Sequence, residues 1–295
     1  MMTGSFVERA ITVTFQLGTG AFGNSGFNTL TLEGLRCEVH ATIATLPESP
    51  SAVLRVYGMT LSQINQLSVA GLTFQERNNR VAIQAGNVGE KLATIFNGTI
   101  YEARPDFSNQ PDTSFLVIGV GTLGIQLTPV APTSFKGGVP VETALTAIAA
   151  KAGLTVENHG VTAVLSNPYF PGDAMAQIKA CLRAADCLGS IDPVRNVLVI
   201  WPKLGSAPSS AGAVPTISPA TGMIGYPSFS RNYIQVRTLF DPSIKGSGSV
   251  FRVESELTAA NGLWRIVNIE YDLSSQTPGG PWEMTIEGYP AQPQP

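Results

Sequence analysis

The sequence has few charged residues. Only 13% of its 295 residues are Asp, Glu, Lys or Arg, against about a quarter in an average soluble domain. The net charge is −3, and lysine and arginine form no cluster, so we expect no binding of nucleic acid through phosphate neutralisation. A chain with so little surface charge is expected to bury much of its exterior in an assembly.

Long hydrophobic runs are also missing. No uncharged apolar run approaches the roughly eighteen residues that a membrane-spanning helix needs. Residues 1–10 contain no basic region that leads into an apolar stretch. We therefore expect neither a membrane anchor nor a conventional secretion signal.

Cysteine and histidine are scarce, which limits the available chemistry. The three cysteines, Cys37, Cys181 and Cys187, form no CxxC pair, so we expect reduced thiols that act as small core residues. The two histidines, His40 and His159, have no neighbour at a metal-binding or general-base spacing. We predict no catalytic residue, no metal and no cofactor. An enzyme that uses two carboxylates distant in sequence stays an open alternative.

Glycine is abundant, at 30 residues, and one run has the pattern of a nucleotide-binding turn. Residues 114–124, SFLVIGVGTLG, combine an apolar run with G-x-G-x-x-G. A dinucleotide site needs a helix directly after these glycines. Pro129 and Pro132 predict that no helix starts there. We interpret this run, and a second match at residues 18–23, as glycine-rich turns.

The first third of the chain alternates apolar and polar residues with period two, which is typical of half-buried antiparallel strands. Strands are predicted at residues 11–17, 35–43, 52–57, 80–85, 93–103 and 113–120. Thr60 and Gln63 have the spacing of a capping box and predict one short helix. This pattern favours a small β-barrel or sandwich over residues 1–130.

The period changes to that of helices after a proline-containing linker at residues 128–136. Residues 141–152 place apolar side chains on one helical face, with Gly153 as the end signal. A second helix is predicted to begin near Asp173. Short strands are predicted at residues 154–157, 188–192 and 196–201. Together these elements predict an α+β domain over residues 131–205.

After a second linker, at residues 204–215, the β alternation returns. Strands are predicted at residues 233–239, 250–255, 263–273 and 282–288. Trp264 and Trp282 alternate within these strands and are expected in the core. The third predicted domain covers residues 206–295, and the whole chain is expected to be α+β and mainly β.

The order of these parts resembles that of baseplate central hub proteins of long-tailed phages, especially the contractile-tailed, Mu-like group. The resemblance covers nearly the whole chain, from FLVIGVGTLG at the end of the first domain through VPVETALTAIAAKAGL and NVLVIWP. Its most specific part is C-terminal, in MIGYPSF, IQVRTLFDPSIKGSGSVFRVES, GLWRIVNIEYDL and PWEMTIEGYP.

The resemblance implies a structural hub with two tube-like antiparallel β-barrel domains flanking a small α+β insert domain. Such hubs form homotrimers whose β domains make a pseudo-sixfold ring. The ring joins the tail tube or distal tube ring above to the central spike below, and lines a channel through which DNA passes without specific binding. Tape-measure and baseplate wedge proteins are further expected partners.

The same resemblance places the chain in the virion, at the tail baseplate, after assembly in the host bacterial cytoplasm. The sequence has no lysozyme-like or peptidoglycan-cleaving insert, so we do not expect an enzyme. A second interpretation is a β-rich receptor- or carbohydrate-binding tail module. It needs a surface cleft lined by exposed aromatic side chains such as Tyr169, Phe170 or Trp264.

One segment is predicted to make contacts within this assembly. Residues 18–28 are rich in glycine and asparagine and read as a long hairpin tip. The residues expected to touch the neighbouring ring are Phe22, Gly23, Asn24, Ser25 and Gly26.

Overall fold

The computed structural model describes residues 7–23, 26–68, 78–108, 110–203, 214–230, 233–244, 246 and 248–291. Strands make up 48% of the chain and helices 16%, which confirms the expected mainly β fold with few helices. The chain divides into two compact units. Unit 1 comprises Met1–Ala41, Ser51–Gly121 and Tyr271–Trp282, and unit 2 comprises Thr42–Pro50, Thr122–Glu270 and Glu283–Pro295. The three domains expected from the sequence stay a prediction.

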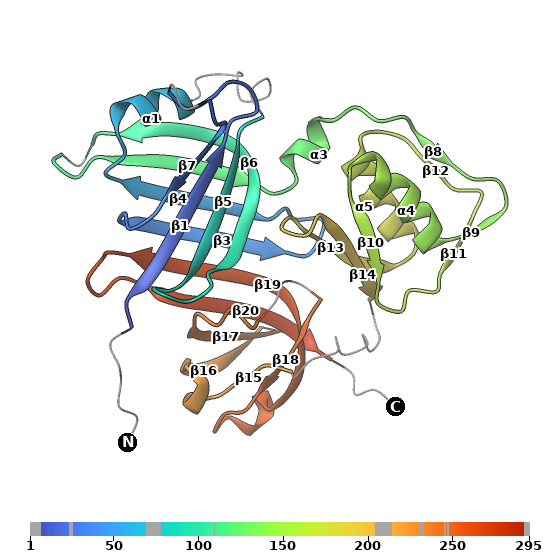
Figure 1. Ribbon diagram of the computed structural model, residues 1–295. Helices are drawn as coiled ribbons and strands as arrows, with labels where there is room; N and C mark the ends of the chain where they lie inside the picture. The colour runs from blue at the N-terminus through green and yellow to red at the C-terminus, as the bar shows by residue number, and fades with distance from the viewer. Residues whose placement is uncertain are drawn as a thin grey trace. The chain divides into compact units, whose positions relative to one another are not determined.

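Unit 1 is an antiparallel β structure that carries the short helix α1 (Figure 1). Its elements are β1 (Arg9–Gln16), β2 (Thr29–Leu32), β3 (Cys37–Ala44), β4 (Ser51–Tyr57), α1 (Leu61–Leu67), β5 (Arg80–Asn87), β6 (Ala93–Asp106) and β7 (Ser114–Val120). The strands are ordered β3-β4-β7-β6-β5-β1-β2. Alternate side chains of a strand point to the same face of the sheet. In β1 the alternate residues Ile11, Val13 and Phe15 are accordingly buried. Only the short strand β2 was not expected.

Most of the glycine-rich run of residues 114–124 forms β7 and belongs to the core of this unit. β7 pairs antiparallel with both β4 and β6, whereas a dinucleotide fold requires parallel neighbours. Gly119 packs so closely on Phe96 that a Cβ atom there would lie 2.7 Å from the ring.

The prediction that no helix follows this run is wrong. The helix α3 (Leu123–Leu127) begins at the last residues of the run. Pro129 restricts the backbone conformation only at its own position and at the residue before it, Thr128. Thr128 is accordingly extended and ends the helix after five residues.

The first part of unit 2 packs two helices against a three-stranded sheet (Figure 1). Its main elements are α4 (Val141–Lys151), β10 (Thr155–Asn158), α5 (Ala174–Ala184), β13 (Cys187–Asp192) and β14 (Val197–Pro202), and its sheet order is β10-β14-β13. Gly153 follows α4 with a φ of +69°, and the Asp173 carboxylate caps α5, as expected. The short strands not expected are β8 (Thr133–Ser134), β9 (Gly138–Pro140), β11 (Val164–Ser166) and β12 (Tyr169–Phe170).

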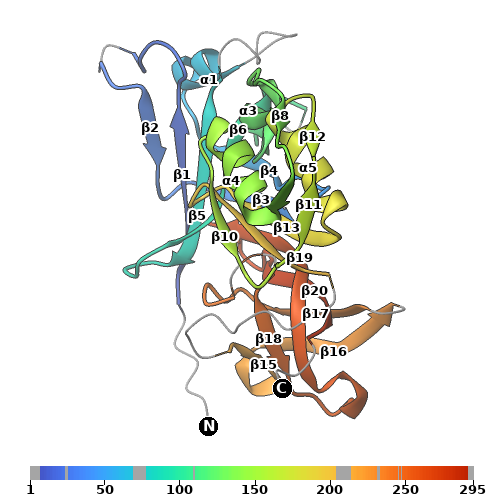
Figure 2. The same cartoon turned by 90° about the vertical axis from the view of Figure 1, so that its right-hand side faces the viewer.

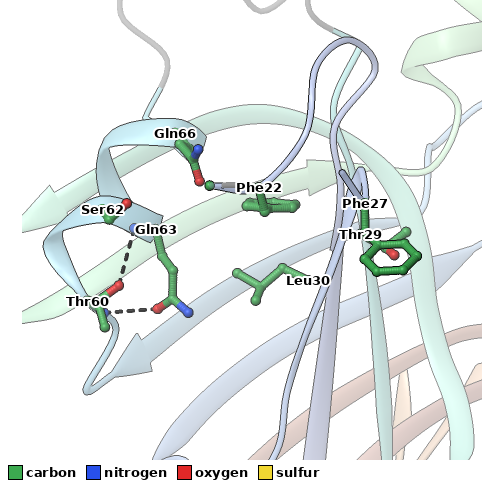
Figure 3. Close-up of a pocket in the computed structure, with 9 residues that line it drawn as sticks. Phe22, Phe27, Thr29, Leu30, Thr60, Ser62, Gln63 and Gln66 are labelled. Atoms are coloured by element: carbon green, nitrogen blue, oxygen red, sulfur yellow. Dashed lines mark hydrogen bonds between the residues drawn. The ribbon is translucent and has the colours of Figure 1, made fainter. Parts of the chain in front are cut away.

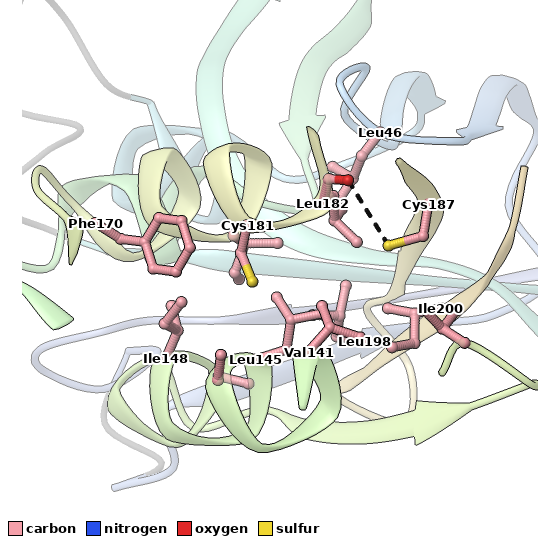
Figure 4. Packing of buried hydrophobic residues seen from close by; sticks show 14 of the residues in the cluster. Leu46, Val141, Leu145, Ile148, Phe170, Cys181, Leu182, Cys187, Leu198 and Ile200 are labelled. Carbon is pink, nitrogen blue, oxygen red and sulfur yellow. Dashed lines mark hydrogen bonds between the residues drawn. The ribbon is translucent and has the colours of Figure 1, made fainter. Parts of the chain in front are cut away.

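A buried apolar cluster holds these elements together (Figure 4). Its members include Leu46, Val141, Leu145, Ile148, Phe170, Ile178, Cys181, Leu182, Cys187, Leu198 and Ile200. Leu46 comes from the corner between β3 and β4, far from the others in sequence. The corner is fixed by backbone and side-chain bonds, because the Leu46 amide donates to the Gly189 carbonyl at 2.8 Å and the Ser190 hydroxyl donates to the Ala44 carbonyl at 3.0 Å.

A polar node attaches the predicted linker of residues 128–136 to the helices. Gln177 is 0% exposed, and its amide nitrogen donates to the carbonyls of Ala131 (3.1 Å) and Gly172 (2.7 Å). The Thr133 hydroxyl donates to the Gln177 amide oxygen at 2.6 Å. Lys151 Nζ donates to the Ala131 carbonyl at 2.6 Å. The segment around residues 131–133 is therefore held in place by side-chain hydrogen bonds.

The second part of unit 2 is β-rich. Its elements are β15 (Thr216–Ile217), η2 (Pro219–Thr221), β16 (Met223–Ser230), β17 (Tyr233–Leu239), β18 (Val250–Val253), η3 (Thr258–Ala260), β19 (Gly262–Ser275) and β20 (Trp282–Pro290). The order is β16-β17-β20-β19, and β18 pairs with β19 and β15. Trp264 is buried as expected. Most of the second predicted linker lies outside the described residues.

Candidate interaction surface at the β1–β2 hairpin tip

The hairpin that joins β1 to β2 continues beyond the ladder of the two strands. The Leu17 amide donates to the Asn28 carbonyl at 2.8 Å, and the Asn28 side-chain amide donates back to the Leu17 carbonyl at 3.3 Å. Further out, the Phe22 amide donates to the Phe27 carbonyl at 2.8 Å. Gly23 has a φ of +53°, which glycine adopts at little cost. The tip is thus an ordered extension of the sheet up to residues 22 and 27.

Helix α1 lies next to this hairpin and is fixed at its first turn by the predicted capping box (Figure 3). The Gln63 amide donates to Thr60 Oγ1 at 3.3 Å, and the Thr60 amide donates to Gln63 Oε1 at 3.0 Å. Leu67 is buried and anchors the last turn, while Leu61 is 65% exposed. The helix therefore packs through one end and leaves the other in solvent.

A groove of about 480 Å³ separates the hairpin from α1. Its lining residues are Phe22, Gly23, Phe27, Thr29, Leu30, Thr60, Ser62, Gln63 and Gln66. Figure 3 shows Phe22 and Leu30 between α1 and the hairpin, with Phe27 and Thr29 on the other side of the strand. None of these residues is charged, so the groove offers apolar surface, hydroxyls and amides but no ion pair.

Only part of the predicted contact segment is seen to line this groove. Phe22 and Gly23 line it, although the Phe22 side chain is buried. Asn24 and Ser25 lie outside the described residues. Phe27, just beyond the predicted segment, has 71% of its surface exposed.

Sequence reasoning missed the contribution of α1 to the groove. The capping box predicted the helix, and Gln63 and Gln66 at a spacing of three residues share one helical face. What the sequence did not show is that this face lies beside a hairpin tip more than thirty residues earlier in the chain.

None of the three cysteine thiols is activated as a nucleophile. Burial raises the pKa of Cys37 to about 12, of Cys181 to about 12 and of Cys187 to about 11. All three side chains are buried and reduced, as expected. They are therefore protonated at neutral pH and cannot act as thiolate nucleophiles.

Both histidines contact a carboxylate. His40 Nδ1 lies 2.7 Å from Asp272 Oδ1 on the exposed face of β3. His159 Nε2 lies 2.6 Å from Glu157 Oε1. The expectation that neither histidine has a sequence neighbour to orient it is wrong for His159, because the turn after β10 folds the ring back over the strand. Hydrogen bonds from His159 and then from Arg195 lower the pKa of Glu157.

The described residues contain no group of three or more His, Cys, Asp or Glu side chains that could hold a metal ion. Among the helices of the described segments, none is long and apolar enough to cross a membrane.

The aromatic residues named for a carbohydrate site do not gather in a cleft. Phe170 belongs to the buried cluster of unit 2. Trp264 is also buried, and its indole nitrogen donates to the Ala260 carbonyl at 2.8 Å. Tyr169 alone of the three is exposed, and the groove beside α1 contains none of them.

Solved structures with this fold are phage tail proteins and their relatives. A tail protein from Neisseria meningitidis MC58 matches with a TM-score of 0.64 at 9% identity, over 96% of each chain. The 43 kDa tail protein of prophage MuSo2 from Shewanella oneidensis matches with a TM-score of 0.59 at 10% identity, over 97% of this chain and 100% of the other.

A third similar structure comes from a secretion system. The E. coli c3393 protein, a component of the type VI secretion system described as similar to the T4 phage tail proteins gp27 and gp5, has a TM-score of 0.58 at 9% identity. The match covers 86% of this chain and 73% of that one. At such identities the likeness shows the fold, which is that of a tail protein.

The sequence itself matches the family of baseplate hub gp41 proteins over residues 10–285. The chain belongs to this family, and its role is that of a structural component of a baseplate. No curated protein matches the sequence. The resemblance noted in the sequence is thereby confirmed at the level of the family.

Proposed function

We propose that the chain forms a trimeric, pseudo-sixfold ring that joins the tail tube to the central spike and lines the DNA channel. The observation that carries the proposal is the family match over residues 10–285, together with a tail-protein fold that extends over nearly all of the chain. Tape-measure and wedge proteins are further partners. The chain acts within the virion baseplate, after assembly in the host cytoplasm, and has no catalytic role.

The charges of unit 1 support a channel wall to which DNA does not adhere. Arg36, directly before β3, contacts Glu38 at 3.0 Å, and Arg55 on β4 contacts Asp106 at 2.8 Å. On β6, Arg104 contacts the neighbouring Glu102 at 2.6 Å. Arginines that are already paired with carboxylates gain less from contacting phosphates, since DNA must first displace the carboxylate. A polymer of phosphates can therefore pass such a wall without being held.

The hairpin tip is the part of unit 1 that we assign to the contact with the neighbouring ring. It has an exposed Phe27, a groove without charges and a backbone held by its own hydrogen bonds. Deletion of residues 22–26 is expected to leave unit 1 folded and to abolish docking on tail tubes. If tails assemble normally with this deletion, the assignment of the tip is wrong.

The mass of the purified protein in solution tests the ring. Light scattering over a range of concentrations, alone and with the adjacent spike protein, is expected to give three times the chain mass of 31.1 kDa. A monomer that becomes a trimer only with the spike also supports the proposal. A monomer at every concentration that ignores the spike overturns it, and a glycan-binding screen for a receptor-binding role then follows.

A further inference from the structure

The free edge of β2 is the feature of the molecule that best fits a partner. β2 pairs with β1 on one side and ends the order of strands in unit 1. Figure 2 shows it as the outer strand beside β1. A strand at the edge of a sheet presents unpaired N–H and C=O groups along its outer side.

The register tells which residues of β2 present these groups. The Leu17 amide donates to the Asn28 carbonyl, so this opposed pair is hydrogen-bonded. In an antiparallel ladder hydrogen-bonded pairs alternate with non-bonded pairs. The Phe15/Leu30 pair is therefore also bonded, while the Thr14/Thr31 pair is not.

The backbone N–H and C=O of Thr29 and Thr31 thus point away from β1, toward the free edge. The side chains agree with this assignment, because the hydroxyls of Thr14 and Thr31 lie 3.2 Å apart, as expected for the closer, non-bonded type of pair. Among the described residues, no strand pairs with the outward groups of Thr29 and Thr31 and no backbone hydrogen bond uses them.

The groove borders one end of this strand. Thr29 and Leu30 both line it, and successive residues of a strand point to opposite faces of the sheet. The groove offers Phe22 and Leu30 on the side of α1 (Figure 3), and hydroxyl and amide groups around them.

β2 lacks the features that prevent edge pairing in many proteins. Its sequence, TLTL, contains no lysine, no proline and no charge, and these are the usual protections. The edge strand β16 of unit 2 differs, because it contains Pro227 and a register shift between Ile224 and Ser228. Only the shortness of β2 limits its pairing.

We infer that β2 is a docking strand, to which an extended segment of the neighbouring ring adds through backbone hydrogen bonds in the groove beside α1. The inference rests on the proposed axial contact with the tail tube. The partner segment carries no charged side chain over its paired residues, because the groove could not neutralise one. It alternates apolar residues toward Phe22 and Leu30 with polar residues toward Thr29.

The test uses the full-length chain and the tail-tube protein of the same phage, assembled into tubes. Hydrogen exchange is measured on peptides that cover residues 26–34, with and without tubes. The amides of Thr29 and Thr31 are expected to exchange rapidly in the free chain and to become protected on the tubes. The Leu30 amide, which faces β1, should be protected in both states.

A pair of variants separates backbone pairing from side-chain contact. Thr31→Pro removes the outward N–H without removing a hydrogen bond to β1, and is expected to weaken tube binding about tenfold or more, the equivalent of about 1.4 kcal/mol. Thr31→Val also loses the hydroxyl contact with Thr14 but keeps the outward N–H, and is expected to bind as the parent does.

The outcomes distinguish this inference from the proposed function. If the parent binds tubes but Thr29 and Thr31 gain no protection, or if Thr31→Pro and Thr31→Val bind equally well, the docking strand is wrong and the hub assignment stands. If the parent does not bind tubes at all, the axial contact fails and this inference fails with it. Protection of the two amides by concentration alone assigns the edge to a second copy of the chain and overturns the inference.

Discussion

The hairpin tip of unit 1 and the α4–α5 cluster of unit 2 are built in opposite ways. The cluster surrounds Leu145 and Ile178, both fully buried, and even its polar member Gln177 has every side-chain group paired. The tip exposes Phe27, the neighbouring helix α1 exposes Leu61, and a groove stays open between them. Substitutions in the cluster should therefore change the free energy of unfolding, whereas substitutions at the tip should change association.

The largest effect is expected for Leu145→Ala. Removing a fully buried leucine side chain costs about 2–5 kcal/mol of unfolding free energy, since a cavity is left in the cluster. Leu61→Ala at the exposed start of α1 is the matched control and should change stability by less than about 0.5 kcal/mol. Urea unfolding of both variants measures the difference. Equal effects of the two substitutions would contradict the contrast between the regions.

A smaller loss is expected for Gln177→Leu. Leucine fills a similar volume but removes the hydrogen bonds that Gln177 makes with the carbonyls of Ala131 and Gly172 and with the Thr133 hydroxyl, at a cost of about 1–3 kcal/mol. Gln66→Leu in α1 is the control, since Gln66 lines the open groove where water replaces a lost contact. Thermal unfolding should separate the two, and a control as unstable as Gln177→Leu would show that the tip is packed like a core.

The capping box of α1 gives an effect of about 1 kcal/mol. Thr60→Ala removes the acceptor for the Gln63 amide, and such losses cost about 0.5–2 kcal/mol. Ser62→Ala, two residues along and not a cap, should cost less. The expected result is faster amide exchange in residues 61–67 with little change in α4 or α5. A uniform loss of protection throughout both units would argue that α1 is not a local element.

The smallest effect depends on pH. Hydrogen bonds from Ser108 and then from Arg55 hold the pKa of Asp106 well below its ordinary value. A carboxyl group with a lowered pKa stabilises the folded state above its unfolded pKa of about 3.9, and this stabilisation is lost as the pH falls toward the folded value. Asp106→Asn should therefore unfold more easily than the parent at pH 7.

The difference between Asp106→Asn and the parent should shrink at pH 3 and below. Asp112→Asn serves as the control, because the Asp112 side chain is 70% exposed and lies 3.5 Å from Arg36. Denaturant unfolding at pH 7, 5 and 3 makes the comparison. A deficit of Asp106→Asn that does not vary with pH would show that its carboxylate charge contributes nothing.

The sequence predicted the elements whose pattern is local. The period-two strands of β1 and β17, the amphipathic α4 and α5 and the Thr60 capping box all form as predicted, because each depends on residues within about ten positions. Strands of two to four residues, such as β2 and β12, were missed because they are too short to show a period and form only with a distant partner. The eight-residue β16 was also missed, since Gly225 and Pro227 interrupt its pattern.

The groove was only half predictable for the same reason. Glycine and asparagine in residues 18–28 indicate a hairpin tip, and this pointed to Phe22 and Gly23. The neighbouring face of α1, with Gln63 and Gln66, is brought there by tertiary packing, which no local pattern records.

The corner of residues 42–50 also affects when the chain can finish folding during its synthesis. Its Thr45 amide donates to the Val267 carbonyl at 3.0 Å, and its Leu46 amide donates to the Gly189 carbonyl. The ribosome makes this corner long before either acceptor exists. Contacts of such sequence separation slow folding, and a nascent or truncated hub that ends before Val267 cannot complete them. Translation to nearly the last strand is thus a precondition for completing this corner.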